Sequence, residues 1–411
     1  MVNTGIKTKN KRINGKGKMV TENEYAHWLF NVPGMGKKSI EKVLCSGMTC
    51  KEVYEASERE FKGLLTEKTI KSLSDSRKKW DFESEKNKLS QKGIIFVSRI
   101  DRKFPDKLKN IPDAPFAIYY KGKLPDPDTP SVAIIGARIC SDYGRYMARN
   151  FGRGLALAGV QIISGMARGI DGVSQKAAVE AGGMSYGILG NGVDVCYPEE
   201  NMDVYRGLCK NGGIISEYPP GTLPKAGFFP MRNRIISGLA DIVLVIEARE
   251  KSGTQITVDT ALEQGREVLA VPGRVTDRLS DGCNALISQG AGVAICIEDI
   301  LDRLDKYTVY ANKNGTKHQG DGATSVNFDI NRNCEEDSGE DDACGVKEIS
   351  IEDTILEGMD VIPVSMSQIM DYLYNRNIDI SIPQVMGYLM ELTYSGKVIQ
   401  DGAYYRRRIP V

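Results

Sequence analysis

The stretch from Ser131 to Asp171 constrains the fold of this chain more than any other part of its sequence. Two short runs rich in β-branched residues, Val132–Ile135 and Val160–Ile163, flank a segment whose apolar residues recur at helical spacing, Tyr143–Ala158. This pattern predicts a strand, a helix and a second strand. A connection of this length makes the two strands parallel, so the turns that follow them lie at the same edge of one sheet.

Each of these turns carries an arginine among small residues. Arg138 ends the turn Gly136–Arg138, directly after the first strand, and Arg168 lies within Ser164–Asp171, after the second. Ligands of open α/β sheets bind at the edge formed by the carboxyl ends of the strands, where helix N-termini favour anions. We therefore expect Arg138 and Arg168 to point into one pocket that binds phosphate groups.

The whole chain predicts an α/β fold, in which an extended Rossmann-like, doubly wound sheet is flanked by two smaller modules. Strands and helices alternate over residues 131–305, and short strands over residues 93–124 are expected to join the same sheet. The expected organisation is a flexible basic tail (1–20), a helical SAM or helix-hairpin-helix-like domain (21–85), the extended Rossmann-like domain (91–305), a flexible acidic linker (306–348) and a winged-helix-like domain (349–411).

The first flanking module begins with a clear helix signal. Thr21 and Glu24 have the spacing of a capping box, which satisfies the first backbone amides of a helix. The segment Val32–Lys38 that follows has two possible interpretations. It resembles the turn of a helix-hairpin-helix, in which glycine amides and a lysine approach a phosphate, and it is equally compatible with a plain helical connector.

The last module, residues 349–411, is expected to hold two helices and a hairpin. The helices are Met366–Tyr374 and Pro383–Tyr394, capped by Ser365 and Ser381, and the hairpin follows the second helix. This order of elements is typical of a winged helix. The second helix contains no lysine or arginine, so we do not expect strong recognition of duplex DNA.

The composition excludes several classes of protein. The 54 basic residues balance 54 acidic ones, so an anion site must be local. No apolar run approaches about 18 residues, which predicts no membrane segment. Nine scattered cysteines without a CxxC pair suggest reduced thiols in a cytoplasmic protein. The two histidines, His27 and His318, have no evident metal or catalytic partners, and the first turn lacks GxGxxG, so we expect no metal, no cofactor and no enzymatic activity.

A further loop, Lys225–Arg234, is expected at the same edge of the sheet. It places two aromatic residues beside three cationic side chains and an amide. Aromatic rings stack on bases, and arginines bind phosphates through parallel hydrogen bonds. We therefore expect Arg232 and Arg234 to join Arg138 and Arg168 in one cradle for an unpaired polynucleotide.

Eight sequence blocks over about residues 93–305 carry a resemblance to a known family. They read, in order, SVAIIGARICSDYG, SGMARGID, LGNGVDVCYP, ISEYPPGTLP, FFPMRNRIISGLADIVLVIEA, SGTQIT, ALEQGREVLAVPG and DGCNALISQGA. In these blocks the chain resembles the DNA-processing protein A family, also called DprA or Smf. The resemblance implies a bacterial cytoplasmic protein that binds and protects single-stranded DNA without sequence preference. It also implies a homodimer formed through the Rossmann-like domain, and loading of the RecA recombinase during natural transformation and homologous recombination.

The same resemblance implies which residues contact DNA. The full set of candidate DNA- or phosphate-binding residues is Arg138, Ser164, Gly165, Arg168, Gly169, Lys225, Phe229, Arg232, Asn233 and Arg234. Arg138 and Arg168 resemble the principal basic contacts of the family. Backbone amides of the 164–169 turn are expected to hold one phosphate, and Phe228 or Phe229 to stack on bases. Two positions depart from the family pattern: Ala137 replaces a usual hydroxyl residue, and Phe104-Pro105 replaces a usual Tyr-Pro.

Two other functions stay open at this point. The α/β pattern also resembles nucleotide phosphoribohydrolases, whose PGGxGTxxxE loop cleaves a base from a nucleotide. The nearest stretch here, Glu247–Thr254, lacks both the PGG and the glutamate of that loop. The second alternative is a transcriptional regulator that acts on duplex DNA through residues 349–411 and uses the pocket as a ligand sensor.

Overall fold

The computed structural model describes residues 19–304, 350–359, 363–376, 378, 380–402 and 404–408. The expected basic tail up to residue 18, the expected linker over residues 306–348 and His318 lie outside these described residues. The chain divides into two compact units, one ending at Asp305 and the other beginning at Lys306. Each unit is described by itself.

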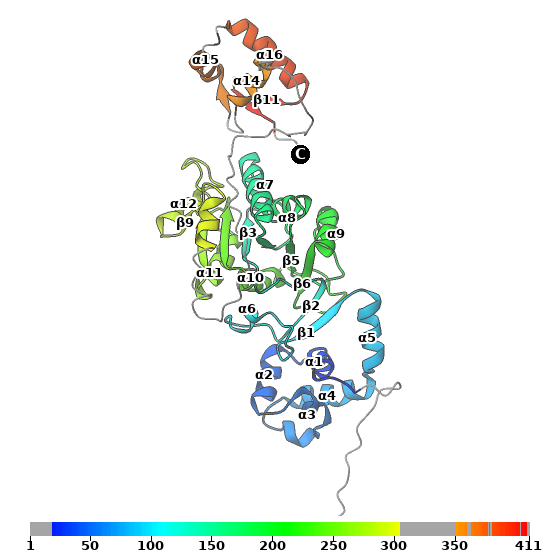
Figure 1. Cartoon of the computed structure of the whole chain (residues 1–411). Coiled ribbons are helices and arrows are strands. Elements are labelled where there is room, and N and C mark those ends of the chain that lie inside the picture. The colour runs from blue at the N-terminus through cyan, green and yellow to red at the C-terminus, as the bar shows by residue number, and fades with distance from the viewer. Residues whose placement is uncertain are drawn as a thin grey trace, which may run out of the picture. The chain divides into compact units, whose positions relative to one another are not determined.

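A nine-stranded sheet organises the first unit, with the strand order β1-β2-β6-β5-β4-β3-β7-β8-β9 (Figure 1). The strands are β1 (Ile95–Ser98), β2 (Ala117–Gly122), β3 (Ser131–Gly136), β4 (Gln161–Ser164), β5 (Ser185–Leu189), β6 (Gly212–Ser216), β7 (Ile242–Ile246), β8 (Glu267–Ala270) and β9 (Gly292–Val293). All neighbours from β6 to β9 in this order are parallel, whereas β1 pairs antiparallel with β2, and β2 antiparallel with β6. The predicted α/β class with a mostly parallel sheet is confirmed.

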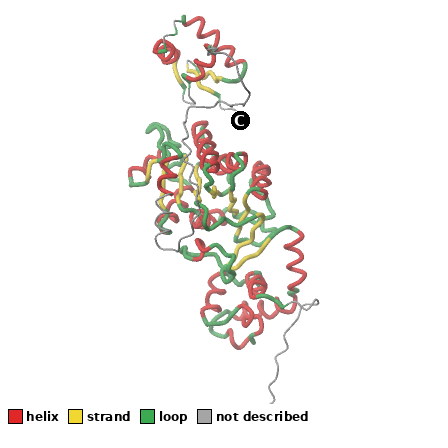
Figure 2. The backbone as a smooth tube through the Cα atoms, viewed as in Figure 1, coloured by secondary structure: helices red, strands yellow, loops and turns green. Residues whose placement is uncertain are grey.

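Helices cover both faces of the sheet, as the tube in Figure 2 shows. They are α6 (Asp106–Lys109), α7 (Asp142–Leu157), α8 (Ile170–Glu180), α9 (Met202–Lys210), α10 (Phe228–Leu239), α11 (Gly253–Glu263) and α12 (Asp281–Ser288). Strand β3 shows why both faces need a cover. Val132 and Ile134 pack into a core with α7 and α8, while Ala133 and Ile135 pack into a second core with α10, α11 and α12. The sequence of a strand buried on both faces is an unbroken apolar run, and residues 132–135 of β3 form such a run.

The order of the strands reverses at β3. From β3 the chain proceeds through α7 to β4, and then to β5 and β6 on one side, whereas β7 lies on the other side of β3. The carboxyl ends of two strands that diverge in this way leave a crevice between their following turns. The turns after β3 and β7 therefore lie where an open α/β sheet binds its ligand.

The helices that precede the sheet pack against its antiparallel end. They are α1 (Glu22–Phe30), α2 (Lys37–Cys45), α3 (Cys50–Glu55), the 3₁₀ turn η1 (Glu58–Phe61), α4 (Glu67–Lys79) and α5 (Phe82–Gln91). Thr21 and Glu24 form the predicted capping box at the start of α1. Lys37, in the turn with two possible interpretations, forms an ion pair with Asp113. Its ammonium is therefore bound to a carboxylate of the sheet domain instead of facing an open phosphate site.

The second unit contains three helices and a three-stranded antiparallel sheet among its described residues. These elements are α14 (Ile351–Glu357), β10 (Val364–Ser365), α15 (Met366–Asn375), α16 (Ile382–Tyr394), β11 (Val398–Asp401) and β12 (Tyr404–Arg407). The sheet order is β10-β12-β11. Ser365 and Ser381 occupy the N-cap positions of α15 and α16. Sequence reasoning did not identify α14 or β10, which are short.

No helix among the residues that the structure describes combines the length and the apolar content needed to cross a lipid bilayer.

Candidate functional site

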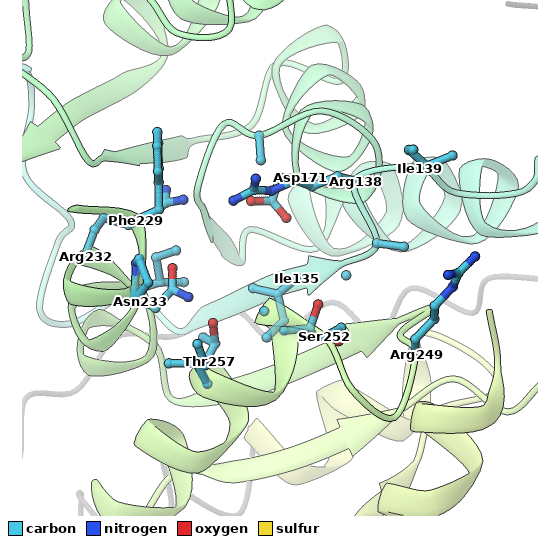
Figure 3. Close-up of a pocket in the computed structure, with 18 of the residues that line it drawn as sticks. Ile135, Arg138, Ile139, Asp171, Phe229, Arg232, Asn233, Arg249, Ser252 and Thr257 are labelled. Carbon is cyan, nitrogen blue, oxygen red and sulfur yellow. The ribbon is translucent and has the colours of Figure 1, made fainter. Parts of the chain in front are cut away.

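A cavity of about 530 Å³ opens at the carboxyl edge of β3 and β7, at the reversal of the strand order (Figure 3). Five segments provide most of its lining: the turn after β3, the connection from β4 to the start of α8, the first turns of α10, the turn after β7, and the first turns of α11. Among the predicted site residues, Arg138, Phe229, Arg232 and Asn233 line this cavity. The place of the pocket thus agrees with the expectation from the sequence, although only part of the predicted residue set reaches it.

Arg138 is the predicted residue that the structure places most favourably. Its side chain is exposed at the rim, and its guanidinium carbon lies 5.6 Å from the ring centroid of Phe229. Among the described residues it has no ion-pair partner. An unpaired cation over an aromatic face keeps its hydrogen-bond donors available for a phosphate.

The turn that carries Arg138 is fixed by Glu247, the residue directly after β7. The backbone amide of Ala137 donates to the backbone oxygen of Glu247 at 2.7 Å. The buried carboxylate of Glu247 accepts a hydrogen bond from the Ser141 amide at 2.8 Å, just before α7. This carboxylate therefore supports the Arg138 turn. It is bound to Ser141, which argues against its use as a catalytic acid in the phosphoribohydrolase alternative.

Arg168 does not line the cavity, so the expectation that it shares a pocket with Arg138 is wrong. Its Nε lies 2.6 Å from Oε2 of Glu200, and its Nη2 lies 2.7 Å from Oε1 of the same carboxylate. Glu200 belongs to a 3₁₀ turn, η2 (Glu199–Asn201), in the connection after β5. Both side chains are exposed. The partner lies 32 positions away in the sequence, and no local pattern links the two residues.

Several donors of the turn from Ser164 to Gly169 bind protein groups, and its role as a phosphate cradle stays a prediction. The Ser164 hydroxyl donates to the backbone oxygen of Ile134 at 2.6 Å. The Gly165 amide donates to Oδ2 of Asp171 at 3.1 Å, and the next amide donates to Gln175 at 3.0 Å. Side chains of α8 therefore occupy the amides of Gly165 and Met166, and Ser164 and Gly165 support the turn from inside.

Asp171 takes the place of an anion at the start of α8. A carboxylate in the first turn of a helix is favoured by the helix dipole. Burial raises the pKa of Asp171, while the nearby charge of Arg232 and the amides of Gly165 and Ala167 oppose that rise. Gly169, just before α8, has φ 72°, and a Cβ there would lie 2.2 Å from the backbone oxygen of Ala137. Gly169 thus lets the two turns approach each other.

The segment expected as a loop with two cooperating arginines is the helix α10. Residues two positions apart on a helix face different directions. The Nη1 of Arg232 donates to the backbone oxygen of Gly165 at 2.7 Å and to that of Ile188. Burial lowers the pKa of Arg232 to about 10. Arg232 lines the cavity, but its guanidinium mainly ties α10 to the turns after β4 and β5.

Arg234 does not line the cavity, so the expectation that it joins Arg138 in one cradle is wrong. Its Nε lies 2.9 Å from Oδ2 of Asp113, and its Nη2 lies 2.7 Å from Oε2 of Glu217. The side chain is buried. Pro230 suggested a loop, but proline is tolerated in the first turn of a helix, where its missing amide has no intrahelical partner anyway.

Aromatic residues extend from the rim of the cavity. The Lys225 ammonium lies 5.6 Å from the ring centroid of Phe228, which stacks on Tyr218 with centroids 4.1 Å apart. The ring of Phe229 lies 5.6 Å from that of Tyr197. Sequence reasoning did not select either tyrosine as a site residue. The available signal was that each precedes a proline within the blocks that resemble the family.

The opposite wall of the cavity was missed as part of the site. It comes from the turn after β7 and from the start of α11, and its polar members are Arg249, Ser252, Thr254 and Thr257. Arg249 is exposed and has no ion-pair partner among the described residues. The signal that could have found this wall is the topology itself, because the turn after β7 must lie beside the turn after β3.

Comparisons with known proteins agree with this architecture. Residues 95–305 match the family described as DNA recombination-mediator protein A. The chain is 41% identical over 204 residues to the DNA processing protein DprA of Streptococcus pneumoniae, which covers 50% of this chain and 72% of that protein. It is 40% identical over 243 residues to the protein Smf of Escherichia coli, covering 59% of this chain and 64% of that protein.

A solved structure extends the agreement to the fold. The X-ray structure of DprA from Streptococcus pneumoniae matches with a TM-score of 0.58 and 33% identity, covering 68% of this chain and 97% of that one. Because the family match spans half of the sequence, this chain belongs to the DNA recombination-mediator protein A (DprA/Smf) family.

Proposed function

We propose that this protein binds single-stranded DNA without sequence preference at the cavity between β3 and β7, and acts as a recombination mediator without catalysing a reaction. The observation that carries the proposal is Arg138, an exposed cation over Phe229 with no ion-pair partner among the described residues. A phosphate can bind to the guanidinium while an unstacked base packs on a nearby aromatic ring. The DNA-processing names of the relatives support the same role.

Single strands should bind better than duplexes. Phe229 sits at the rim, and Phe228 is already stacked on Tyr218. Only a base that has left its stack can reach such a ring, and a duplex would have to break base pairs to offer one. The overall charge balance gives the protein no general attraction for duplex DNA.

The proposal extends to partners. We infer that the protein forms a homodimer through the α/β domain, protects incoming strands in the cytoplasm and passes them to the RecA recombinase. Family membership supports this inference. The helices and hairpin of the second unit follow a winged-helix order, and we assign them that fold.

The test compares single-stranded and double-stranded oligonucleotides of one length in a mobility-shift experiment at physiological salt. The wild-type protein should bind the single strand far more tightly than the duplex. Arg138→Ala should lower the affinity for the single strand by about tenfold, which corresponds to the loss of one charged hydrogen bond. Arg206→Ala, on the exposed surface of α9, is the matched control and should bind as wild type. RecA added to the protein–strand complex should form filaments faster than on the strand alone. Equal retention of both DNA forms, or an Arg138→Ala protein that binds as wild type, would contradict the proposal.

A further inference from the structure

The wall of the cavity formed by the start of α11, together with Asn233, contains polar side chains that have no hydrogen-bond partner among the described residues. Thr257 is 3% exposed and lines the cavity, yet its hydroxyl makes no hydrogen bond with any described residue. The Ser252 hydroxyl is buried and likewise has no partner. The side chains of Asn233 and Thr254 line the same space and form no hydrogen bond among the described residues. In Figure 3, Asn233, Ser252 and Thr257 face one common part of the pocket.

A buried hydroxyl without a partner destabilises a fold, because it has lost its hydrogen bonds to water. Threonine in a helix ordinarily avoids this by donating to the carbonyl one turn earlier. Thr260, one turn further along α11, does so, since its hydroxyl lies 3.1 Å from the backbone oxygen of Ile256. Thr257 differs from Thr260 in lining the cavity, where a bound ligand can form a hydrogen bond with its hydroxyl.

The backbone beside these side chains adds further donors. Helix α11 starts at Gly253, and its N-cap residue, Ser252, makes no side-chain capping bond. The first amides of a helix have no intrahelical acceptor, and they favour an anion. Arg138 and Arg249, which have no ion-pair partner among the described residues, stand at the rim of the same cavity. Several donors and two positive charges therefore line one cavity, together with the carboxyl group of Asp171.

We propose that this part of the cavity binds the terminal phosphate of a nucleotide, either a free nucleoside monophosphate or the phosphorylated end of a strand. A phosphate monoester has three terminal oxygens and nearly two negative charges at neutral pH. A phosphate inside a strand has two such oxygens and one charge, and its chain must leave in two directions. The monoester matches the number of donors and the two cations better, and the buried position of Thr257 suits a group at the end of a chain.

The rest of the cavity suits the remainder of a nucleotide. Ile135, Ile236 and Phe229 provide apolar surface for a sugar and a base. The cavity volume of about 530 Å³ is within the range of small-molecule sites, roughly 300–1,000 Å³. This inference rests on the proposed single-strand function, because it assigns the end of the strand to the inner cavity and the following phosphate to Arg138.

The test uses the full-length protein and oligo-dT labelled at its centre, with a 5′-phosphate, a 3′-phosphate or hydroxyls at both ends. Fluorescence anisotropy should show about tenfold tighter binding for one phosphorylated end than for the hydroxyl strand. Free dTMP should compete with the phosphorylated strand, and thymidine should not. Competition by dTMP without any preference between strand ends would identify the free nucleotide as the ligand.

Two matched variants separate the inference from the proposed function. Thr257→Val should abolish the preference for a phosphorylated end and melt no lower than wild type, since the lost hydroxyl has no hydrogen-bond partner among the described residues. Thr260→Val removes a bonded hydroxyl outside the cavity and should keep the preference. The inference is overturned if all strand ends bind with equal affinity and dTMP does not compete. If strand binding still depends on Arg138 in that case, the proposed function is unaffected. If no strand binds at all, the proposed function fails, and direct calorimetric titration of dTMP then decides the inference alone.

Discussion

The guanidinium carbon of Arg138 lies 5.6 Å from the ring centroid of Phe229, and the two residues come from different segments, the turn after β3 and the first turn of α10. This pair forms the open rim of the cavity. Arg232 contacts the same ring from within the protein, at 6.0 Å, but donates its hydrogen bonds to backbone oxygens. Of the four arginines predicted to contact the strand, Arg138 alone has neither an ion pair nor a hydrogen bond to protein among the described residues, so the proposed strand contact depends mainly on it.

The two arginines that do not line the cavity should respond differently to replacement. Arg234→Ala should lower the free energy of unfolding by about 3–5 kcal/mol, because it leaves the carboxylate of Glu217 without its buried partner. Arg168→Ala removes an exposed ion pair and should leave the unfolding midpoint unchanged. Urea denaturation followed by circular dichroism measures both. Equal, small effects would show that the ion pair between Arg234 and Glu217 does not stabilise the fold.

The ion pair between Arg168 and Glu200 makes a prediction about DNA binding. Glu200→Gln should release Arg168 and strengthen binding of poly-dT, more at low salt than at high salt, if the strand passes over the 3₁₀ turn η2. Anisotropy titrations at two salt concentrations measure the effect. The double variant Glu200→Gln with Arg168→Ala is the control and should lose the gain. An unchanged affinity for Glu200→Gln would place the strand away from Arg168.

Gly169 should be needed for both stability and binding. Its φ of 72° and the short distance from an added Cβ to the Ala137 oxygen make Gly169→Ala strained and displace the turn that carries Arg138. We expect a loss of about 1–3 kcal/mol in stability and weaker strand binding. Gly159→Ala is the matched control, because Gly159 has φ 81° but nothing within 4 Å of an added Cβ. That variant should lose roughly 1–2 kcal/mol and bind as wild type. Equal binding by both variants would refute the role of Gly169 in placing Arg138.

Stability should fall in mild acid because of His27. Burial lowers the pKa of His27 to about 4 from its ordinary 6.5, among the rings of Trp80, Phe96 and Tyr119. Between these two values the unfolded chain binds a proton that the folded chain does not, so the free energy of unfolding decreases as the pH falls from about 6.5 to 4. The loss should be about 2–3 kcal/mol. Glutamine at position 27 cannot take up this proton. As the pH falls from about 6.5 to 4, the urea midpoint of the wild-type protein should therefore decrease more than that of His27→Gln. A constant difference would contradict the assignment.

The fold was accessible from the sequence where local patterns decide it. The strand–helix–strand unit around Arg138, the capping box at Thr21 and the parallel sheet all follow from periodicity and capping rules. The direction of each arginine was not accessible, because it depends on distant partners. Glu200 holds Arg168, and Asp113 together with Glu217 holds Arg234.

The wall formed by α11 was missed for a related reason. Its residues were compared only with a catalytic motif, and Glu247–Thr254 lacks that motif. Among the described residues the Ser252 hydroxyl is buried without a partner, and Thr257 lines the cavity, and no sequence pattern reports either feature. Likewise, α10 begins with Phe-Phe-Pro and reads as a loop, yet it is a helix that separates Arg232 from Arg234.

The salt dependence of poly-dT binding tests the central claim most directly. The slope of log affinity against log salt should be shallower for Arg138→Ala than for wild type by about 0.7 units for each phosphate contact that is lost. Arg206→Ala should keep the wild-type slope. The account predicts one lost contact for Arg138→Ala, and an identical slope for wild type and Arg138→Ala would contradict it.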